Sequence, residues 1–286
     1  MSEAKVLGGM RKQDQPATTI KQASKWPTIN FRELWAYREL LFILAWRDIS
    51  VRYKQSVVGI GWAILQPLLM MIIFTIVFGK FANLPSEGIP YPIYTFCALL
   101  PWNYFAGSLT GSSNSLVGSA NLVTKVYFPR LVLPLSKVFG GLIDFGIGFI
   151  ILLGMMVWYG VTPTVGILFL PLFLLVAMLA SLGVGLWLTA INVKYRDVVF
   201  VVPFLVQFWM YASPVAYSAT IVPEKYQWIY GLNPMVGIIE GFRWAMLGTV
   251  SPNFGIMLVS LVGILVILIS GLFYFKKMEK TFADII

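Results

Sequence analysis

Long apolar stretches alternate along this chain with short polar and basic segments. No charged residue occurs from Gly88 to Thr124, from Phe145 to Val193, or from Val198 to Pro223. Because a helix needs about 20 mostly apolar residues to cross a bilayer, runs of this length predict membrane-spanning helices. The pattern predicts an all-α polytopic membrane protein with six spans, at residues 57–79, 92–116, 138–159, 167–191, 198–218 and 254–275.

The segment before the first span has a different pattern. Residues 31–54 combine a helical stripe of apolar residues and tryptophans with basic residues, which is typical of an amphipathic interfacial helix. A buried first span is the alternative, but the charged side chains between Arg32 and Glu39 are costly at membrane depth. Residues 1–30 are polar and lack the apolar stretch of a signal peptide, so we expect them to form a cytoplasmic tail.

Residues 219–252, between the fifth and sixth spans, are too apolar for an exposed loop and too interrupted to form a span. Gly231, Asn233 and Pro234 break the run. Irregular backbone at membrane depth is tolerated only against protein or a water-filled cavity. We therefore expect one or two short external re-entrant helices here.

The charge distribution predicts the orientation. The chain is 58% hydrophobic and 12% charged, with a net charge of +9. With both termini in the cytoplasm, cytoplasmic segments hold 18 of the 21 Lys and Arg residues, and only Lys80, Lys225 and Arg243 fall elsewhere. Such segregation marks the cytoplasmic side of a membrane protein, so we expect no nucleic-acid partner and both termini inside.

Few residues are suited to catalysis or metal binding. The chain has no histidine, and its one cysteine lies within the second predicted span. Only three acidic residues are expected on the external face, Glu87, Glu224 and Glu240. No phosphate-binding GxxxxGK[ST] loop is present. We therefore expect no catalytic site, metal or cofactor in this chain, and any ATP to be used by another chain.

The second predicted span is unusually polar, with seven Asn, Ser and Thr residues from Asn103 to Ser115. They either form hydrogen bonds between packed helices or line a path for a hydrophilic substrate. Aromatic residues near span ends either form interfacial belts or stack on sugar rings. The candidate path residues are Trp102, Asn103, Tyr104, Ser108, Ser112, Trp209 and Tyr211. Asp144, in the third span, is either functional or bonded to a neighbouring helix.

The segment NLVTKVYFPRLVLP, residues 121–134, separates the second and third spans. We expect a short cytoplasmic helix at 119–128. It should stop before Pro129, because a proline disfavours helical conformation in the residue before it. The segment is either a basic loop that enforces topology or a rigid helix that inserts into a partner's pocket. Its candidate contact residues are Lys125, Tyr127, Phe128, Pro129 and Arg130.

Four segments in order resemble ABC-2 type permeases of polysaccharide and O-antigen exporters. They are WRDISVRYKQSVVGIGWAILQP (46–67), residues 121–134, NVKYRDV (192–198) and LNPMVGIIEGFRWAMLG (232–248). The likeness runs from about residue 30 to the end, and residues 31–286 would form the transmembrane domain. It implies a homodimer of six-span subunits in the bacterial inner membrane, bound to two copies of an ATPase subunit that holds ATP and Mg. The substrate would be a lipid-linked glycan, moved from the cytoplasmic to the outer face.

The resemblance also implies roles for particular segments. Residues 119–130 would couple the ATPase to the spans. The lipid-linked precursor carries phosphate at the cytoplasmic surface, where Arg47, Arg52 and Lys54 precede the first span. We expect these residues to attract it, although they could instead only set the topology.

Three other functions compete with glycan export. The first is an ABC-2 exporter of small molecules or drugs, which the polar second span and the external aromatics disfavour. The second is a membrane-embedded glycan-processing enzyme, which the lack of histidine and of clustered external acids disfavours. The third is a passive channel, which would need a ring of like charges or carbonyls.

Overall fold

The structure, a computed structural model, describes residues 31–54, 60–249 and 253–285, which form helices and connecting loops without a β-strand. The elongated helices are α2 (Arg38–Lys54), α3 (Ile60–Phe74, continued by a π-helical segment Thr75–Phe81), α4 (Tyr91–Asn114), α6 (Val132–Tyr159), α7 (Leu170–Lys194), α8 (Val198–Tyr211), α10 (Pro234–Leu247) and α11 (Phe254–Met278). The short ones are α1 (Phe31–Ala36), α5 (Ala120–Lys125), α9 (Gln227–Gly231) and α12 (Phe282–Ile285).

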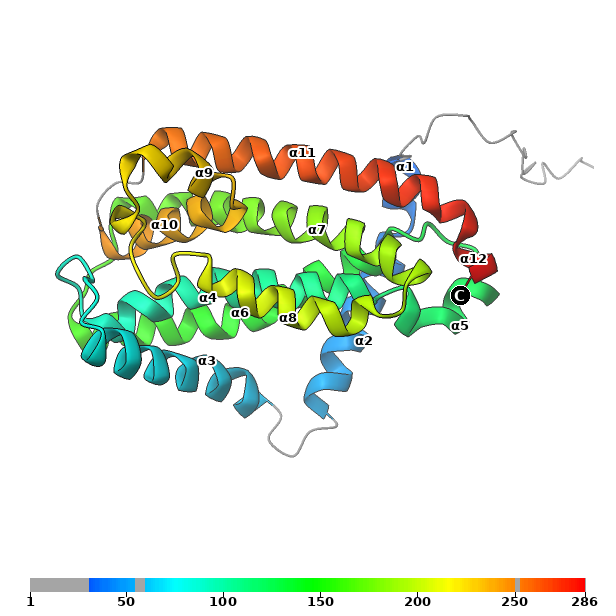
Figure 1. Cartoon of the computed structure of the whole chain (residues 1–286). Helices are drawn as coiled ribbons and strands as arrows, with labels where there is room; N and C mark the ends of the chain where they lie inside the picture. Colours follow the sequence, from blue (N-terminus) through cyan, green and yellow to red (C-terminus); the bar gives the residue numbers. More distant parts are fainter. Residues whose placement is uncertain (1–30, 55–59, 250–252, 286) are drawn as a thin grey trace, which may run out of the picture.

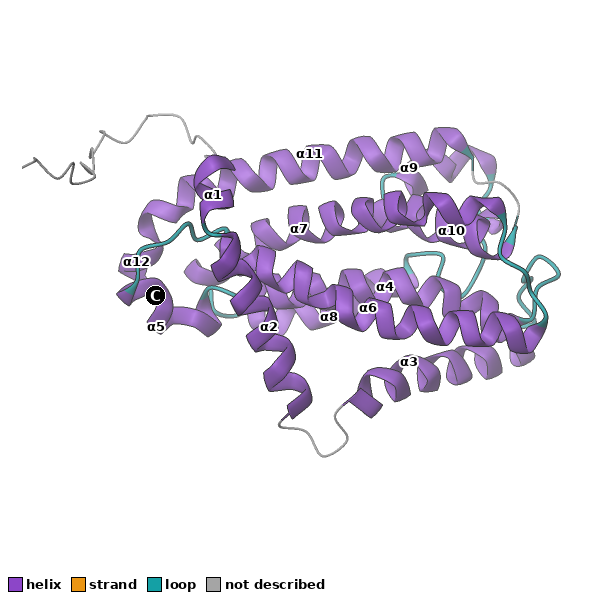
Figure 2. Ribbon diagram, turned by 180° about the vertical axis from the view of Figure 1, so that it is seen from behind, coloured by secondary structure: helices purple, strands orange, loops and turns teal. Residues whose placement is uncertain are grey.

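The helices form an elongated bundle with two different ends (Figure 1). Helices α3, α4, α6, α7, α8 and α11 run along the bundle, and α9 and α10 lie at one end beside the loop from α3 to α4. The opposite end carries α1, α5 and α12, while α2 lies across α6 and points toward the start of α3 (Figure 2). The predicted tail, residues 1–30, lies outside the described residues.

The predicted all-α membrane architecture is confirmed. Four helical stretches within the described residues are long and apolar enough to cross a membrane: Gly61–Phe81, Val132–Tyr159, Val165–Lys194 and Phe254–Thr281. They overlap the first, third, fourth and sixth predicted spans. Helix α4 has 24 residues, about 36 Å, but carries many polar side chains. Helix α8 has 14 residues, about 21 Å, which is less than the thickness of the hydrocarbon core.

Helix α4 is the centre of the bundle. It packs against α3, α6, α7, α8 and α10, and every residue from Ile93 to Phe105 except Asn103 is buried. Helices α7 and α11 meet at glycines, because a Cβ added to Gly271 would lie 2.6 Å from the Gly183 carbonyl oxygen. Such small residues let two membrane helices approach closely. The interior is therefore held by backbone proximity as well as by apolar side chains.

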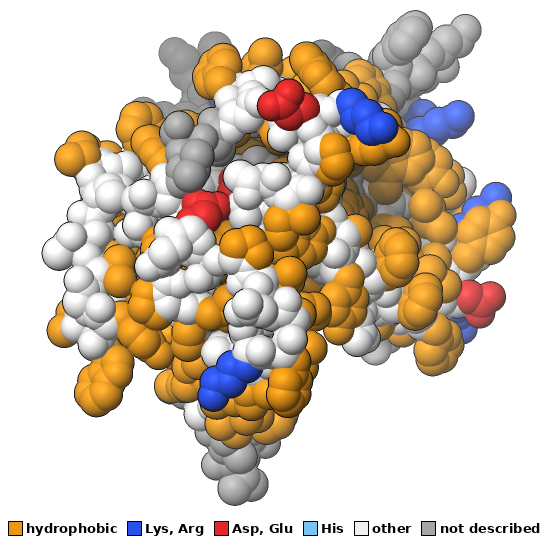
Figure 3. Space-filling view, turned by 60° about the vertical axis from the view of Figure 1, so that its left-hand side comes forward, with side chains coloured by type: hydrophobic (Ala, Val, Ile, Leu, Met, Phe, Trp, Pro, Cys, Tyr) orange, Lys and Arg blue, Asp and Glu red, His pale blue; other side chains and the backbone are white. Residues whose placement is uncertain are grey.

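The outer surface of the bundle is strongly apolar. Large exposed hydrophobic side chains occur along α6, α8 and α11, among them Val157, Trp158, Phe200, Phe204, Phe208, Val262 and Val266. Figure 3 shows such side chains covering much of the α9–α10 end and the adjoining sides, with few charged groups between them. A surface of this kind suits lipid or another membrane chain rather than water.

Some local predictions differ from the structure. The interfacial helix is two helices, α1 and α2, separated at Tyr37. The predicted helix 119–128 is shorter, because α5 ends at Lys125 and Val126 is extended. The predicted external segment 219–252 contains α9 and α10.

Candidate functional site

A cavity of about 750 Å³ lies between α2, α3, α4, α6 and α8. Its polar wall is made by Arg52, Tyr53, Gln66, Asn103, Thr110, Asn114 and Asp144, with Trp62 and Tyr104 among its aromatic residues. Volumes of a few hundred to about 1,000 Å³ are typical of ligand-binding pockets. The mixture of amide, hydroxyl and aromatic groups can bind a polar organic molecule within an otherwise apolar bundle.

One face of α4 forms the cavity wall. Asn103, Gly107, Thr110, Gly111 and Asn114 all line it, at spacings of three and four residues or their sum that place them on one side of a helix. Asn103 and Gly107 are exposed there. A Cβ added to Gly107 would have no neighbour within 4 Å, so α4 is open there, whereas at Gly111 it would lie 3.2 Å from the Lys137 side chain.

The other polar face of α4 packs against neighbouring helices. Ser108 and Ser112 are buried, and the Ser112 hydroxyl donates to the Pro134 carbonyl at 3.2 Å. The Thr189 hydroxyl donates to the Ser112 carbonyl at 2.7 Å, and the Asn192 amide donates to the Ser113 carbonyl at 2.8 Å. One polar face of α4 therefore packs against neighbouring helices, and the other lines the cavity.

Asp144 lies on the cavity wall and has two partners on α2. It forms an ion pair with Arg52 through one carboxylate oxygen and accepts a hydrogen bond from the Tyr53 hydroxyl through the other. Burial and the adjacent Asp144 carboxylate raise the pKa of the Tyr53 phenol. The phenol therefore keeps its proton and remains a donor to Asp144.

The three basic residues expected to attract phosphate lie in three different environments. Only Arg52 lines the cavity. Arg47 pairs with Asp48 at 3.0 Å, and Lys137 of α6 pairs with the other oxygen of Asp48 at 2.6 Å. Lys54 is exposed at the end of α2.

The aromatic residues proposed for the path are also separated. Tyr104 lines the cavity and donates to the Val138 carbonyl at 3.0 Å, whereas Trp102 is buried next to Phe105. Trp209 lines a different cavity, of about 380 Å³, and its indole N–H donates to Asn233 at 2.9 Å. Tyr211 is exposed at the end of α8.

The candidate contact residues around the end of α5 differ in exposure, although they were expected to contact a partner together. Tyr127 is 84% exposed and Lys125 is exposed, whereas Pro129 is buried. Phe128 is only 5% exposed and packs in an internal cluster with Val123, Phe275 and Phe282. Arg130 is bound to Glu279 beyond α11, because its backbone N–H donates to the carboxylate at 3.2 Å and its guanidinium donates to the carbonyl at 2.9 Å.

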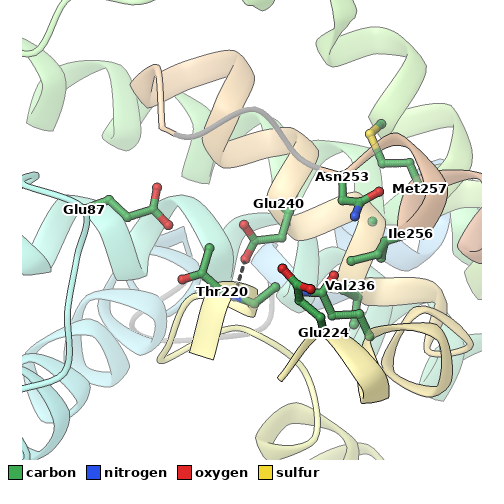
Figure 4. Close-up of a pocket in the computed structure, with 11 residues that line it drawn as sticks. Glu87, Thr220, Glu224, Val236, Glu240, Asn253, Ile256 and Met257 are labelled. Carbon is green, nitrogen blue, oxygen red and sulfur yellow. Dashed lines mark hydrogen bonds between the residues drawn. The ribbon is translucent and has the colours of Figure 1, made fainter. Parts of the chain in front are cut away.

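The α9–α10 end contains a further cavity, of about 400 Å³, which is lined by acidic residues (Figure 4). It is lined by Glu87, Glu224 and Glu240 together with polar side chains such as Thr220 and Asn253. Glu240 accepts a hydrogen bond from the Ala219 backbone at 3.2 Å. Within residues 31–54, 60–249 and 253–285, no three His, Cys, Asp or Glu side chains are placed to hold a metal ion.

Comparison with known proteins identifies the family. A family model described as ABC-2 type transporter matches residues 39–247. The chain belongs to this family. The matched region includes α2, which carries Arg52 and Tyr53, and extends through α10.

Several curated relatives of this ABC-2 chain are named as export or transport proteins. The O-antigen export system permease protein RfbA of Klebsiella pneumoniae is 30% identical over 250 residues, covering 87% of this chain and 95% of the relative. A protein of the same name from Myxococcus xanthus is 33% identical over 215 residues, covering 74% and 82%. The polysialic acid transport protein KpsM of Escherichia coli is 26% identical over 215 residues, covering 73% and 80%.

Sequence reasoning missed several cavity residues of this ABC-2 chain. Gln66, Trp62 and Tyr53 were not selected, and Asp144 was not connected to Arg52. The helical spacing from Asn103 could have identified Thr110 and Asn114. No local pattern indicates that the end of α2 reaches the middle of α6.

Proposed function

We propose that this chain is the permease subunit of an ATP-driven exporter that moves a lipid-linked polysaccharide from the cytoplasmic to the outer face of a bacterial inner membrane. The cavity beside α4 carries the proposal, since it places polar and aromatic groups inside an apolar bundle. The names of the relatives support a glycan substrate.

The cavity chemistry suits sugars. The amides of Gln66, Asn103 and Asn114 can both donate hydrogen bonds to hydroxyl groups and accept them. Trp62 and Tyr104 add flat apolar surface, which suits the C–H faces of sugar rings. The open position at Gly107 leaves room for a substrate beside the helix.

In this proposal the chain has six spans. Helices α4 and α8 cross the membrane together with the four long apolar stretches, and α9 and α10 form the external re-entrant part. The end with α5 and α12 faces the cytoplasm, because Lys125, Arg130, Lys276 and Lys277 lie there and basic residues concentrate on that side. Two copies of the chain form the permease, and their apolar outer faces meet lipid and each other.

The energy comes from another chain. Two copies of an ABC ATPase bind ATP and Mg and contact the cytoplasmic end of the permease. The exposed Tyr127 is the aromatic side chain of the 125–130 segment that can enter a pocket of the ATPase. Lys125 and Arg130 lie beside it at the rim of that contact, while Phe128 and Pro129 support it from within.

The lipid carrier is recognised at the α2 end of the cavity. Arg52 faces the cavity, and Arg47 and Lys54 add positive charge nearby on the same helix. An arginine guanidinium matches the geometry of a phosphate group and can bind it through two N–H groups. Membrane lipids fill the remaining outer surface of the bundle.

Deletion of the gene with controlled complementation tests this function. Loss of the chain should leave the glycan on the cytoplasmic face, and the parent sequence should restore it to the cell surface. We expect Asn103→Leu to restore much less surface glycan while still assembling with the ATPase, and Asn103→Gln, which keeps the amide, to restore more. Thr162→Leu, at an exposed loop position outside the cavity, is the matched control. Normal export by an assembled Asn103→Leu permease would show that the cavity is not the path.

A further inference from the structure

The Arg52–Asp144 ion pair joins two segments that are far apart in sequence. Arg52 is in the last turn of α2, and Asp144 is near the middle of α6. The Arg52 side chain is 60% exposed and that of Asp144 is 33% exposed, and both line the 750 Å³ cavity. The pair is therefore accessible to a molecule that enters the cavity.

The pair is also the charged part of the cavity lining. Within the described lining residues, Arg52 and Asp144 are the ones that carry charge, and the rest are neutral polar, aromatic or aliphatic. The nearby Asp48 is engaged by Arg47 and Lys137. A cavity ligand with negative charge therefore meets one guanidinium, which is already bound to a carboxylate.

The geometry allows Asp144 to lose Arg52 without losing all its partners. Tyr53 donates to one oxygen of Asp144 while Arg52 pairs with the other. If Arg52 turns toward another anion, the Tyr53 hydroxyl still donates to one oxygen of the carboxylate. An accessible ion pair is weak enough to be exchanged, since it stabilises the paired state by no more than about fivefold. A phosphate accepts two guanidinium hydrogen bonds and carries more charge when it is a diphosphate.

We propose that Asp144 is an internal competitor for the anionic group of the lipid carrier. It holds Arg52 when no anion is bound and releases it to the phosphate of the lipid carrier. Asp144 thereby sets a threshold, because an anion must interact with Arg52 more strongly than this carboxylate does. This inference rests on the proposed function and adds a specificity-determining residue to it.

Ligand binding tests the competition. The full-length chain in phosphatidylcholine nanodiscs would be titrated with a long-chain polyprenyl diphosphate. We expect Asp144→Asn to tighten binding by about two- to fivefold, and Arg52→Gln to weaken it. In the double variant, the effect of Asp144→Asn should disappear, because a competitor acts only through the group it competes for. Glu39→Gln is the matched control, since it removes one negative charge from an exposed position of α2 outside the cavity lining.

Each outcome of this titration supports or overturns the proposed competition for Arg52. Unchanged or weaker binding by Asp144→Asn would overturn the competition, as would equal tightening by Glu39→Gln or an Asp144→Asn effect that persists without Arg52. Asp144→Glu keeps the charge, so its affinity for the carrier should stay close to that of the parent. This result would verify that the site is folded. If phosphatidylglycerol shows the same variant effects, the group recognised is an ordinary membrane phosphodiester, and the carrier assignment is wrong. If Arg52→Gln binds the carrier normally, phosphate recognition by Arg52 fails, whereas the glycan path is judged separately by Asn103→Leu.

Discussion

The guanidinium carbon of Arg243 lies 3.8 Å from the centroid of the Tyr94 ring. This contact attaches α10 to the buried part of α4, and the Arg243 side chain is fully buried. The same guanidinium pairs with Glu240 at 3.1 Å and donates to the carbonyls of Val215 and Tyr217 at 2.8 and 2.9 Å. One side chain thus joins α10, α4 and the turn after α8.

Replacing Arg243 should destabilise the α9–α10 end. Arg243→Met leaves the Glu240 carboxylate and two backbone carbonyls without this donor, and breaking a buried ion pair costs about 3–5 kcal/mol. We expect a large fall in the thermal unfolding temperature of the purified chain, measured by tryptophan fluorescence. The double variant Arg243→Met/Glu240→Gln should recover part of the loss, because no unpaired charge remains. A single variant as stable as the parent would contradict this role.

The glycine contact between α7 and α11 can be tested by adding one methyl group. Gly271→Ala places a Cβ against the Gly183 carbonyl, so the helices must separate. Overpacking of this kind typically costs about 1–3 kcal/mol. Gly154→Ala on α6 is the matched control, because its added Cβ has no neighbour within 4 Å. In a denaturant or thermal series, equal stability of the two variants would argue against a close contact.

Tyr127 and Phe128 should give different defects although they are adjacent. Tyr127→Ala leaves the permease stable but should weaken ATPase binding by about 2 kcal/mol or more, as expected for an exposed aromatic anchor. Phe128→Ala removes a buried ring and should cost about 3–5 kcal/mol of permease stability. Lys125→Ala should be milder in both assays. Pull-down affinity and thermal stability, measured on the same preparations, separate these outcomes; identical behaviour of the two aromatic variants would contradict the assignment.

The orientation can be checked with single cysteines. Cys97 is buried and should contribute little background. Thr162→Cys, in the exposed loop after α6, should react with an impermeant maleimide on intact spheroplasts. Asn121→Cys, exposed on α5, should react only after permeabilisation. Labelling of both sites from outside would reverse or invalidate the proposed topology.

Helix positions could be predicted from sequence where a single uninterrupted apolar run forms the whole helix. The apolar runs located α6, α7 and α11, because each is long, uninterrupted and apolar. The fifth predicted span was drawn to residue 218, but α8 ends at Tyr211. The chain turns there because Asn233 donates to the Ala212 carbonyl at 3.1 Å, and Arg243 binds carbonyls a few residues further on. Those donors come from later in the chain, so the local composition does not indicate the break.

The candidate site shows the same limit. Asn103 could be selected because a polar residue in a span is unusual, and the structure places it on a cavity wall. Ser112 was selected on the same ground, yet it faces Pro134 and Thr189 in the helix contact. Composition does not distinguish the two faces of a helix whose neighbours are unknown. The packed face of α4 is the side that α6 and α7 cover, and the sequence of α4 alone does not show which side that is.

The attachment of Arg130 to Glu279 has a mechanical consequence. The connector after α5 is hydrogen-bonded to Glu279 just beyond α11, and Phe128 belongs to the same buried cluster as Phe275 of α11. We therefore expect a displacement at Tyr127 to move the start of α6 and the end of α11 together. If the proposed orientation holds, an ATPase that moves this end should displace α6 and α11 together and not merely bend a loop.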